Sequence, residues 1–303
     1  MSPESQAPGW EWYFVAMYFF VGGVSAGAYF IGSLIELFGG ETRREISRVA
    51  FYIAFPVILI APPLLIADLG RPERFWHLFF YVNGGIPNIN LQSPLSVGSW
   101  ALLLFGGMSF LSFVDNLVAE GHLKFALFAT AYNRIPRKLY ALVGSLAGFF
   151  VASYTGVLIE TTARPLWVAS DQLIGALFIA SAGSCGAAAI YLAMAVRRTL
   201  AHYHLQDFEL FDRIAMVFEL VLIAAMIALA GQFAAPLMSG AVALLFWGGA
   251  VVFGTLVPLA INWFGSRGDH PLSRSSGLVM VMAVLVLFGG ALLRITLVVA
   301  GQM

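Results

Sequence analysis

The sequence has few charged residues and few of the side chains that bind redox metals. Charged residues make up 11% of the 303 residues and their formal net charge is zero, so no basic surface for a nucleic-acid partner is expected. The single cysteine, Cys185, cannot form a disulfide within the chain, and it cannot supply the several thiolates that an iron–sulfur cluster needs. None of the five histidines falls inside a predicted membrane helix, where a pair could hold a haem from both faces. We therefore expect this chain to bind no haem, iron–sulfur cluster or metal, and any electron transfer needs a diffusible cofactor or a partner's cofactors.

Hydrophobic residues, in contrast, make up 60% of the chain and come in runs of about 20 residues. At a rise of 1.5 Å per residue, such runs match a hydrocarbon core of about 30 Å. The N-terminal segment MSPESQAPGWEWY lacks a basic region and a cleavage site, so we expect the first run to be a retained helix. The sequence predicts an all-α integral membrane protein whose eight transmembrane helices lie at 13–35, 49–67, 94–114, 139–159, 173–196, 214–235, 240–264 and 277–300.

Basic residues predict the orientation of these helices, because loops rich in lysine and arginine stay in the cytoplasm. The loops after the first, third, fifth and seventh runs carry twelve such residues. The N-terminal tail, the opposite loops and the C-terminus carry three, namely Arg71, Arg74 and Arg164. We therefore expect a multi-pass protein of the inner membrane with both termini on the periplasmic, or outer, face.

Two runs of small residues suggest an internal repeat. The first predicted helix contains GGVSAGAYF (22–30) and the fifth contains SAGSCGAAAIY (181–191). Both runs allow close helix packing, and both helices cross the membrane in the same direction. We therefore expect two parallel four-helix halves, with residues 1–172 holding the ligand site and residues 173–303 forming the second half.

Two long loops are expected to differ. Residues 68–93 are predicted to hold a short surface helix, PERFWHLFFYV (72–82), followed by the irregular stretch NGGIPNIN (83–90). Residues 115–138 are predicted to form an amphipathic helix on the inner surface. Pro72 and Pro94 have the positions of helix-start prolines, whereas Pro56, Pro62 and Pro63 are expected to kink the second helix or end it early.

The polar boundary after the second run combines an acid with two guanidinium groups. The run ends in Asp68, and Arg71 and Arg74 follow. The order carboxylate, arginine, proline, aromatic recurs after the fourth run in ETTARPLW (160–167), which contains Glu160 and Arg164. We interpret these two helix ends as the place where a small, partly apolar ligand binds close to a docked soluble partner.

Two tyrosines and an arginine in the outer half of the membrane are further candidates. Tyr18 and Tyr154 either pack against their neighbours or donate a hydrogen bond to a quinone carbonyl while their rings pack against apolar groups. Arg294, deep in the eighth run, is expected to pair with Asp68 or Glu160. That pair would either lock two helices together or lie at the edge of a ligand pocket.

Three carboxylates on the inner side define an alternative. Glu36 and Asp115 lie at the inner ends of the first and third runs, and Glu219 lies about two turns inside the sixth. A carboxylate in an apolar environment can carry a proton, so these residues and the outer charges could bracket a route across the membrane. The simpler interpretation is that Glu36 and Asp115 only reach the interface.

Several of these segments together resemble the NrfD/PsrC family, the membrane subunits of polysulfide reductase-like and related respiratory complexes. The segments are FFVGGVSAGAYF, IADLGRPERFWHLF, SPLSVGSW, YTGVLIETTARPLW and LRITLVVAGQ, and the resemblance covers essentially the whole chain. It implies a cofactor-free subunit that binds a quinone, menaquinone or ubiquinone, near the outer face. It also implies a docked iron–sulfur, ferredoxin-like subunit, often joined to a molybdopterin-type catalytic subunit. Carried over by position, the quinone pocket draws on Tyr18, Asp68, Arg71, Tyr154 and Glu160.

We therefore predict a quinone-binding membrane subunit of a respiratory oxidoreductase. Asp68 or Glu160 would exchange protons as general acid or base. Arg71, Arg74 and Arg164 would orient these carboxylates or hold the partner. The alternatives are a proton or ion translocator, a transporter, and a passive anchor without a quinone.

Overall fold

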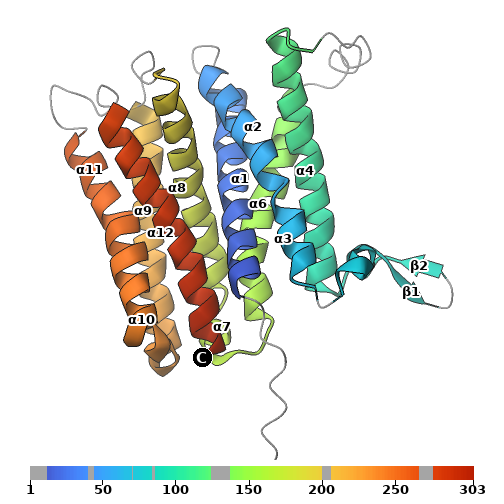
Figure 1. Ribbon diagram of the computed structural model, residues 1–303, viewed down its shortest axis with the longest axis vertical. Coiled ribbons are helices and arrows are strands. Elements are labelled where there is room, and N and C mark those ends of the chain that lie inside the picture. Colours follow the sequence, from blue (N-terminus) through green and yellow to red (C-terminus); the bar gives the residue numbers. More distant parts are fainter. Residues whose placement is uncertain are drawn as a thin grey trace, which may run out of the picture.

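Long helices form the protein in the computed structural model (Figure 1), which describes residues 12–39, 44–69, 71–83, 86–123, 137–199, 206–265 and 276–303. Within these residues, eight spans are long and apolar enough to cross a membrane, so the predicted all-α membrane architecture is confirmed. The spans are α1 (Trp12–Phe38), α2 with α3 (Arg44–Ile58 and Ala61–Ala67), α4 (Pro94–Ala119), α6 (Arg137–Glu160), α8 (Leu173–Val196), α9 with η4 (Gln206–Ala230 and Gly231–Leu237), α10 with η5 and α11 (Gly240–Ala243, Leu244–Leu256 and Val257–Gly265) and α12 (Ser276–Gln302).

Prolines divide the second span. α2 and α3 are separated at residues 59–60, and Pro62 and Pro63 lie in the first turn of α3. Because proline has no backbone N–H, the regular helical hydrogen bonds cannot continue through this pair. The Ile60 N–H instead donates to the Val57 carbonyl at 3.2 Å, a bond that spans three residues. The predicted interruption is confirmed at Pro62 and Pro63, whereas Pro56 lies inside α2 and does not end it.

The central contact of the bundle joins α1 and α8. α1 also packs against α2, α6 and α12, which places it in the middle of the molecule (Figure 1). A β-carbon added at Gly27 would collide with the Ala182 carbonyl, and one added at Gly186 would collide with the backbone of Gly27 and Ala28. Small residues therefore bring the two backbones into direct contact. The two small-residue runs that resemble each other in the sequence are packed against each other.

The other spans lie on either side of this pair. α4 lies next to α2 and α6 at one edge, and α11 with η5 lies next to α9 and α12 at the other (Figure 1). The boundary between residues 1–172 and 173–303 stays a prediction. The closest helix pair, α1 with α8, crosses it.

α1 begins and α12 ends at the same end of the bundle (Figure 1). We name it the outer end after the predicted orientation, which itself stays a prediction. The outer end also carries α3 and the short helix α7 (Pro165–Ala169). The two helix ends that the sequence singled out, at Asp68 and Glu160, are therefore on one side of the bundle.

The chain between α3 and α4 forms a short helix and a hairpin. η2 (Pro72–Leu78) is a 3-10 helix that begins at Pro72, as predicted, but it is shorter than the predicted 72–82. Strands β1 (Tyr81–Asn83) and β2 (Ile86–Asn88) then pair antiparallel, with Tyr81 opposite Asn88, where the end of the helix and irregular chain were expected. The amphipathic helix predicted within 115–138 lies mostly outside the described residues.

The α1–α8 contact makes a direct prediction about two glycines of one helix. Gly27→Ala should lower stability by about 1–3 kcal/mol, because the new methyl group meets the backbone of α8. Gly22→Ala, five residues earlier, should leave stability unchanged or raise it, since its nearest contact would be Val151 at an ordinary 3.9 Å. Thermal unfolding of the two purified variants in the same detergent measures the difference, and equal midpoints would contradict the close contact.

Candidate functional site

A cavity of about 360 Å³ lies at the outer end, among α1, α3, α4 and α6. Most of the described residues that line it are apolar, including Phe14 and Leu158. The polar ones are Tyr18, Asp68 and Thr161. The cavity therefore joins two residues that the sequence singled out, Tyr18 and Asp68, although 50 positions separate them in the chain.

The end of α3 positions Asp68. Asp68 is the residue that follows the last turn of α3, and its N–H donates to the Leu64 carbonyl at 3.2 Å. Leu64 and Leu65 of the same short helix line the cavity as well. The short helix α3, which begins after the proline break, thus contributes both apolar and acidic residues to the cavity wall. Asp68 is half-buried, so its carboxyl group lies between the apolar cavity and the aqueous boundary.

Tyr18 and Tyr154 are both buried, with 3% and 5% of their surface exposed. The Tyr154 ring fills the place where a β-carbon at Gly98 would stand, and it stacks on Phe150 with ring centroids 5.9 Å apart. Within the described part of the chain, its hydroxyl has no hydrogen-bond partner. Tyr154 does not itself line the cavity, but Leu158, one helical turn later on the same face, does. The predicted phenol pair is therefore close to the cavity, with Tyr18 in its wall and Tyr154 behind it.

Glu160 has a structural partner that the sequence did not indicate. Its Oε1 accepts a hydrogen bond from the Ile174 backbone N–H at 3.2 Å, at the start of α8. Asp171 and Gln172 both have positive φ values, 46° and 66°, and this turn leads the chain from α7 into α8. The free N–H groups and the dipole at a helix N-terminus stabilise a carboxylate. Glu160 thus joins α6 to α8, and the cavity is lined by its neighbour Thr161 instead.

The three outer arginines differ in exposure. Arg71 and Arg74 are exposed on either side of the first turn of η2, whereas Arg164 is half-buried at the start of α7. None of the three lines the cavity. Arg71 and Arg74 are therefore placed to meet a molecule that approaches from the aqueous side.

Arg294 is buried at the centre of the bundle, with 1% of its surface exposed. Its Nε donates to the Phe19 carbonyl of α1 at 3.2 Å, and its Nη1 donates to the Ser181 hydroxyl of α8 and the Gly290 carbonyl of α12 at 3.1 and 2.9 Å. The guanidinium also lies 5.1 Å from the centre of the Phe178 ring. None of these contacts is with Asp68 or Glu160, so the predicted ion pair is wrong. The actual partners could not be predicted from the sequence, because they lie on α1, α8 and α12, which are far apart in the chain and converge on this side chain.

Glu219 of α9 lies close to this arginine, on the same face of α8. Its carboxylate accepts a hydrogen bond from the Ser184 hydroxyl at 3.2 Å, one turn along α8 from Ser181. Two further acids of α9 are also buried, Glu209 at 6% and Asp212 at 1% exposure. Asp212 accepts a hydrogen bond from the Asn262 amide of α11 at 3.3 Å. The sequence prediction missed Asp212 because it began the sixth span at residue 214, beyond this acid.

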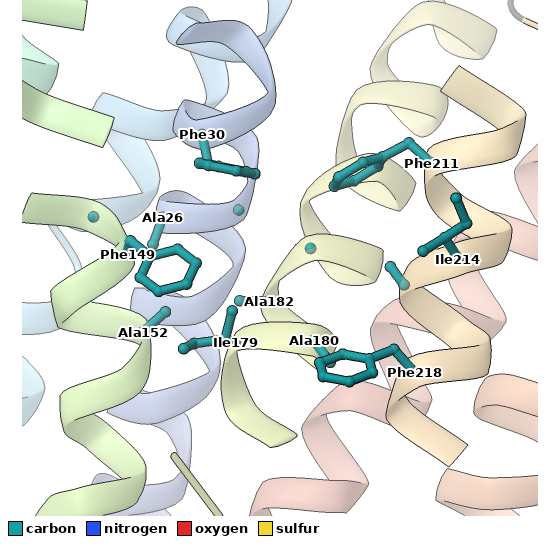
Figure 2. Close-up of a pocket in the computed structure, with 14 residues that line it drawn as sticks. Ala26, Phe30, Phe149, Ala152, Ile179, Ala180, Ala182, Phe211, Ile214 and Phe218 are labelled. Carbon is teal, nitrogen blue, oxygen red and sulfur yellow. The ribbon is translucent and has the colours of Figure 1, made fainter. Parts of the chain in front are cut away.

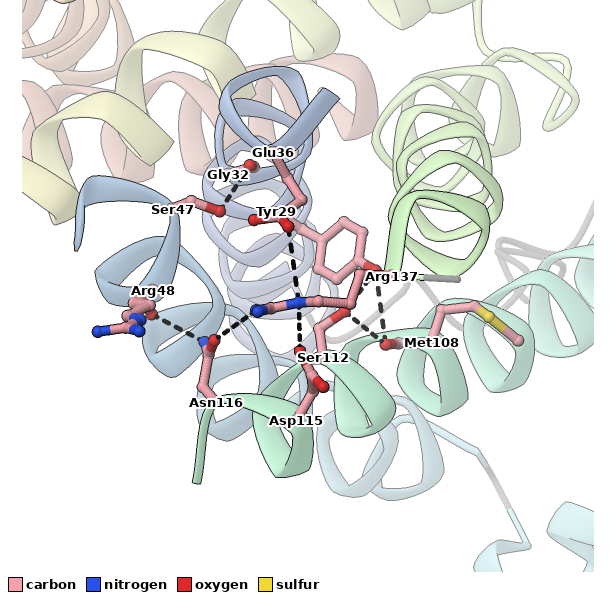
Figure 3. Close-up of polar contacts among 10 residues, drawn as sticks. All are labelled: Tyr29, Gly32, Glu36, Ser47, Arg48, Met108, Ser112, Asp115, Asn116 and Arg137. Atoms are coloured by element: carbon pink, nitrogen blue, oxygen red, sulfur yellow. Dashed lines mark hydrogen bonds and ion pairs between the residues drawn. The ribbon is translucent and has the colours of Figure 1, made fainter. Parts of the chain in front are cut away.

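Glu36 and Asp115 meet Arg137 at the opposite end of the bundle (Figure 3). The Arg137 Nε lies 2.6 Å from Asp115 Oδ2 and 3.5 Å from Glu36 Oε1. Its Nη2 donates to the Asn116 amide oxygen at 3.2 Å. The cluster ties together the ends of α1, α4 and α6. Both acids thus share one cation, which supports a structural role for them.

A second cavity, of about 200 Å³, lies between α1, α6, α8 and α9 (Figure 2). Phe30 and Phe149 form one wall and Phe211 and Phe218 the other, with alanine and glycine residues between them. The described residues that line it carry no ionisable or hydroxyl group. This cavity can accept an apolar chain, but its walls offer no group for proton exchange.

Comparison with known proteins identifies the family. A family model described as "Polysulphide reductase, NrfD" matches residues 3–303. The chain belongs to the NrfD/PsrC family. A polysulfide reductase chain of Wolinella succinogenes is 30% identical, over 97% of this chain and 94% of the relative. A protein NrfD homolog of Haemophilus influenzae is 28% identical over the same shares. A selenate reductase subunit of Mesobacillus selenatarsenatis is 27% identical over 35% of this chain and 22% of the relative. The eight apolar spans and the family membership together make this a multi-pass membrane protein.

The central arginine of this NrfD/PsrC protein should be essential for its stability. Arg294→Met removes the hydrogen bonds by which one side chain joins three helices, so we expect a loss of about 3–5 kcal/mol, as for a broken buried charge network. Ser181→Ala removes one of these bonds and should cost about 1 kcal/mol. The yield of folded protein after detergent extraction and the midpoint of thermal unfolding are measured for both variants. An Arg294→Met protein as stable as Ser181→Ala would show that the arginine does not hold the helices together.

Proposed function

We propose that this protein is the membrane subunit of a respiratory reductase complex and that it binds a quinone in the outer cavity. The family membership and the names of relatives, a polysulfide reductase chain and a selenate reductase subunit, support the role of membrane subunit. The observation that supports quinone binding is the cavity itself, which combines apolar walls with Tyr18 and Asp68.

The residues present fit a quinone. The volume of about 360 Å³ lies in the range of small-molecule sites, which are mostly apolar with a few placed polar groups. A quinone ring offers two carbonyl acceptors on an apolar body, and the Tyr18 hydroxyl is a donor within the wall. The Tyr154 hydroxyl, which has no other partner in the described residues, is a second donor at the back of the site. Menaquinone and ubiquinone share these features.

Each polar residue then has a separate task. A bound quinone supplies the two-electron, two-proton redox chemistry. Tyr18 orients the ring by a hydrogen bond, and Asp68 takes up or releases the proton at the boundary with water, as general base or acid. Of the two predicted acids, Asp68 is the stronger candidate for proton exchange, because it lines the cavity and Glu160 does not.

Electrons are exchanged with a partner at the outer end. We propose an iron–sulfur, ferredoxin-like subunit there, joined to a molybdopterin-type or other catalytic subunit on the periplasmic side of the inner membrane. Exposed Arg71 and Arg74 lie beside α3, whose last turn lines the cavity. A partner that docks on these charges is therefore close to the quinone site.

A second candidate function, proton translocation, is favoured by the buried acids of α9. Glu209, Asp212 and Glu219 lie along this helix, and Glu219 approaches Arg294 through the two serines of α8. Buried acids in a membrane span commonly mark proton routes. Glu36 and Asp115 contribute less to this case, because Arg137 holds both.

Changing the two polar residues of the cavity tests the quinone site. In the intact complex, Asp68→Asn should lower quinol-linked turnover about 100-fold or more, because an amide cannot exchange the proton. Tyr18→Phe should lower it about tenfold through the lost hydrogen bond. Glu45→Gln changes an exposed acid of α2, at the opposite end, and should have no effect. Unchanged turnover in both cavity variants, with normal assembly, would leave the passive anchor as the better description.

Charge reversal at η2 tests the docking surface. The double change Arg71→Glu and Arg74→Glu should reduce the amount of iron–sulfur subunit that co-purifies, and the loss should grow with salt concentration because exposed charges are screened. Arg198→Glu reverses an exposed arginine at the opposite end and should leave the complex intact. Retention of the partner by the double variant would place the docking surface elsewhere.

A further inference from the structure

A second apolar site lies beside the outer cavity. It is a groove of about 320 Å³ between α2 with α3 on one side and α4 on the other. We name it the α3–α4 groove, and the residues that matter for its shape are Leu59, Pro62, Leu65, Phe79, Gly106 and Gly107. The break between α2 and α3 forms part of its wall, because Leu59 lies in the break and Pro62 follows it.

The α3–α4 groove and the outer cavity share a wall. Leu65 of α3 lines both. On α4, Pro94 and Leu95 of the first turn line the cavity, and Ser99 begins the groove one turn later. The cavity and the groove are therefore neighbours that meet at Leu65.

The groove suits a hydrocarbon chain and no polar ligand. Ser99 is the one described lining residue with a polar side chain, and its hydroxyl donates to the Leu95 carbonyl at 2.8 Å. Leu59 and Leu103 are 54% and 56% exposed within the membrane spans, so the groove is open to the lipid side. A charged or hydrogen-bonding headgroup would lose its water here without compensation.

η2 covers the outer end of the groove. Phe75, Leu78 and Phe79 of this segment line it, and the Trp100 indole N–H donates to the Phe79 carbonyl at 3.2 Å. Trp100 also meets the rings of Phe79 and Phe80 edge-on. η2 is thereby attached to α4, and it separates the groove from the aqueous side where a partner would dock.

We propose that the α3–α4 groove binds the isoprenoid tail of the quinone whose ring occupies the outer cavity. This inference rests on the proposed function. The shared Leu65 wall favours this occupant over a phospholipid, because a chain that continues from the cavity reaches the groove directly.

Two glycines of α4 make the proposal testable. A β-carbon at Gly106 or Gly107 would meet no atom within 4 Å, so a side chain can start there without a clash at its base. Gly106→Phe and Gly107→Phe should fill the groove and leave the cavity as it is. Gly248→Phe, in η5 of another span, adds the same ring where the nearest contact is 4.0 Å and serves as the control.

The experiment compares two quinones with the same ring. Binding of menaquinone-4 and of tail-less menadione is measured by tryptophan fluorescence quenching on the purified protein in lipid nanodiscs, after thermal unfolding has shown that each variant is folded. The wild-type protein should bind the tailed quinone at least roughly tenfold more tightly than the tail-less one. Gly106→Phe and Gly107→Phe should remove this preference and keep menadione binding, whereas Gly248→Phe should change neither.

The outcomes separate this inference from the proposed function. Equal affinity of the wild-type protein for both quinones, or an unchanged preference in both phenylalanine variants, would overturn the tail site while the ring site stands. An unchanged preference in both phenylalanine variants would also be expected if the groove held a phospholipid chain. If the wild-type protein binds neither quinone, the proposed quinone function fails as well.

Discussion

The packing of α1 against α8 is the constraint on which the other parts of the bundle depend. Two backbones touch at Gly27, Ala182 and Gly186, so no side chain separates them. In a membrane, where the hydrophobic effect does not drive helices together, such close packing and polar contacts must hold them. Arg294 adds the polar part, because one guanidinium bonds to groups of α1, α8 and α12. The centre is thus held by van der Waals contact and by hydrogen bonds at nearly the same depth.

Charge in this protein is divided between a rigid interior and a site at the outer end. Arg294 and Arg137 each neutralise or bond several buried groups, and Glu160 is bonded to the start of α8. These residues are therefore parts of the scaffold. Asp68 differs, because it follows the last turn of a short helix and lies in the wall of a cavity. This half-buried position at the cavity is why we propose Asp68 for proton exchange with a ligand.

The proline break in the second span shapes both parts of the proposed ligand site. α3, which begins after the break, places Asp68 in the wall of the cavity, and the break leaves Leu59 and Pro62 in the wall of the groove. An unbroken helix would present one continuous apolar face to α4. The same local rule, the missing N–H of proline, thus accounts for a polar site at one end of α3 and an apolar groove at the other.

The sequence by itself determined the number of spans, the kink at Pro62 and Pro63, the starts of η2 and α4, and the family, because run length, proline chemistry and local motifs depend on neighbours in the chain. It also indicated Tyr18 and Asp68, which the tertiary structure places in one cavity. It did not reveal the partners of Arg294 and Glu160, the buried Asp212 or the hairpin. Only the tertiary structure decided these, because each depends on which helices converge. The local sequence around a side chain does not show which distant helix that side chain will contact. The convergence of α1, α8 and α12 depends on packing between residues far apart in the chain.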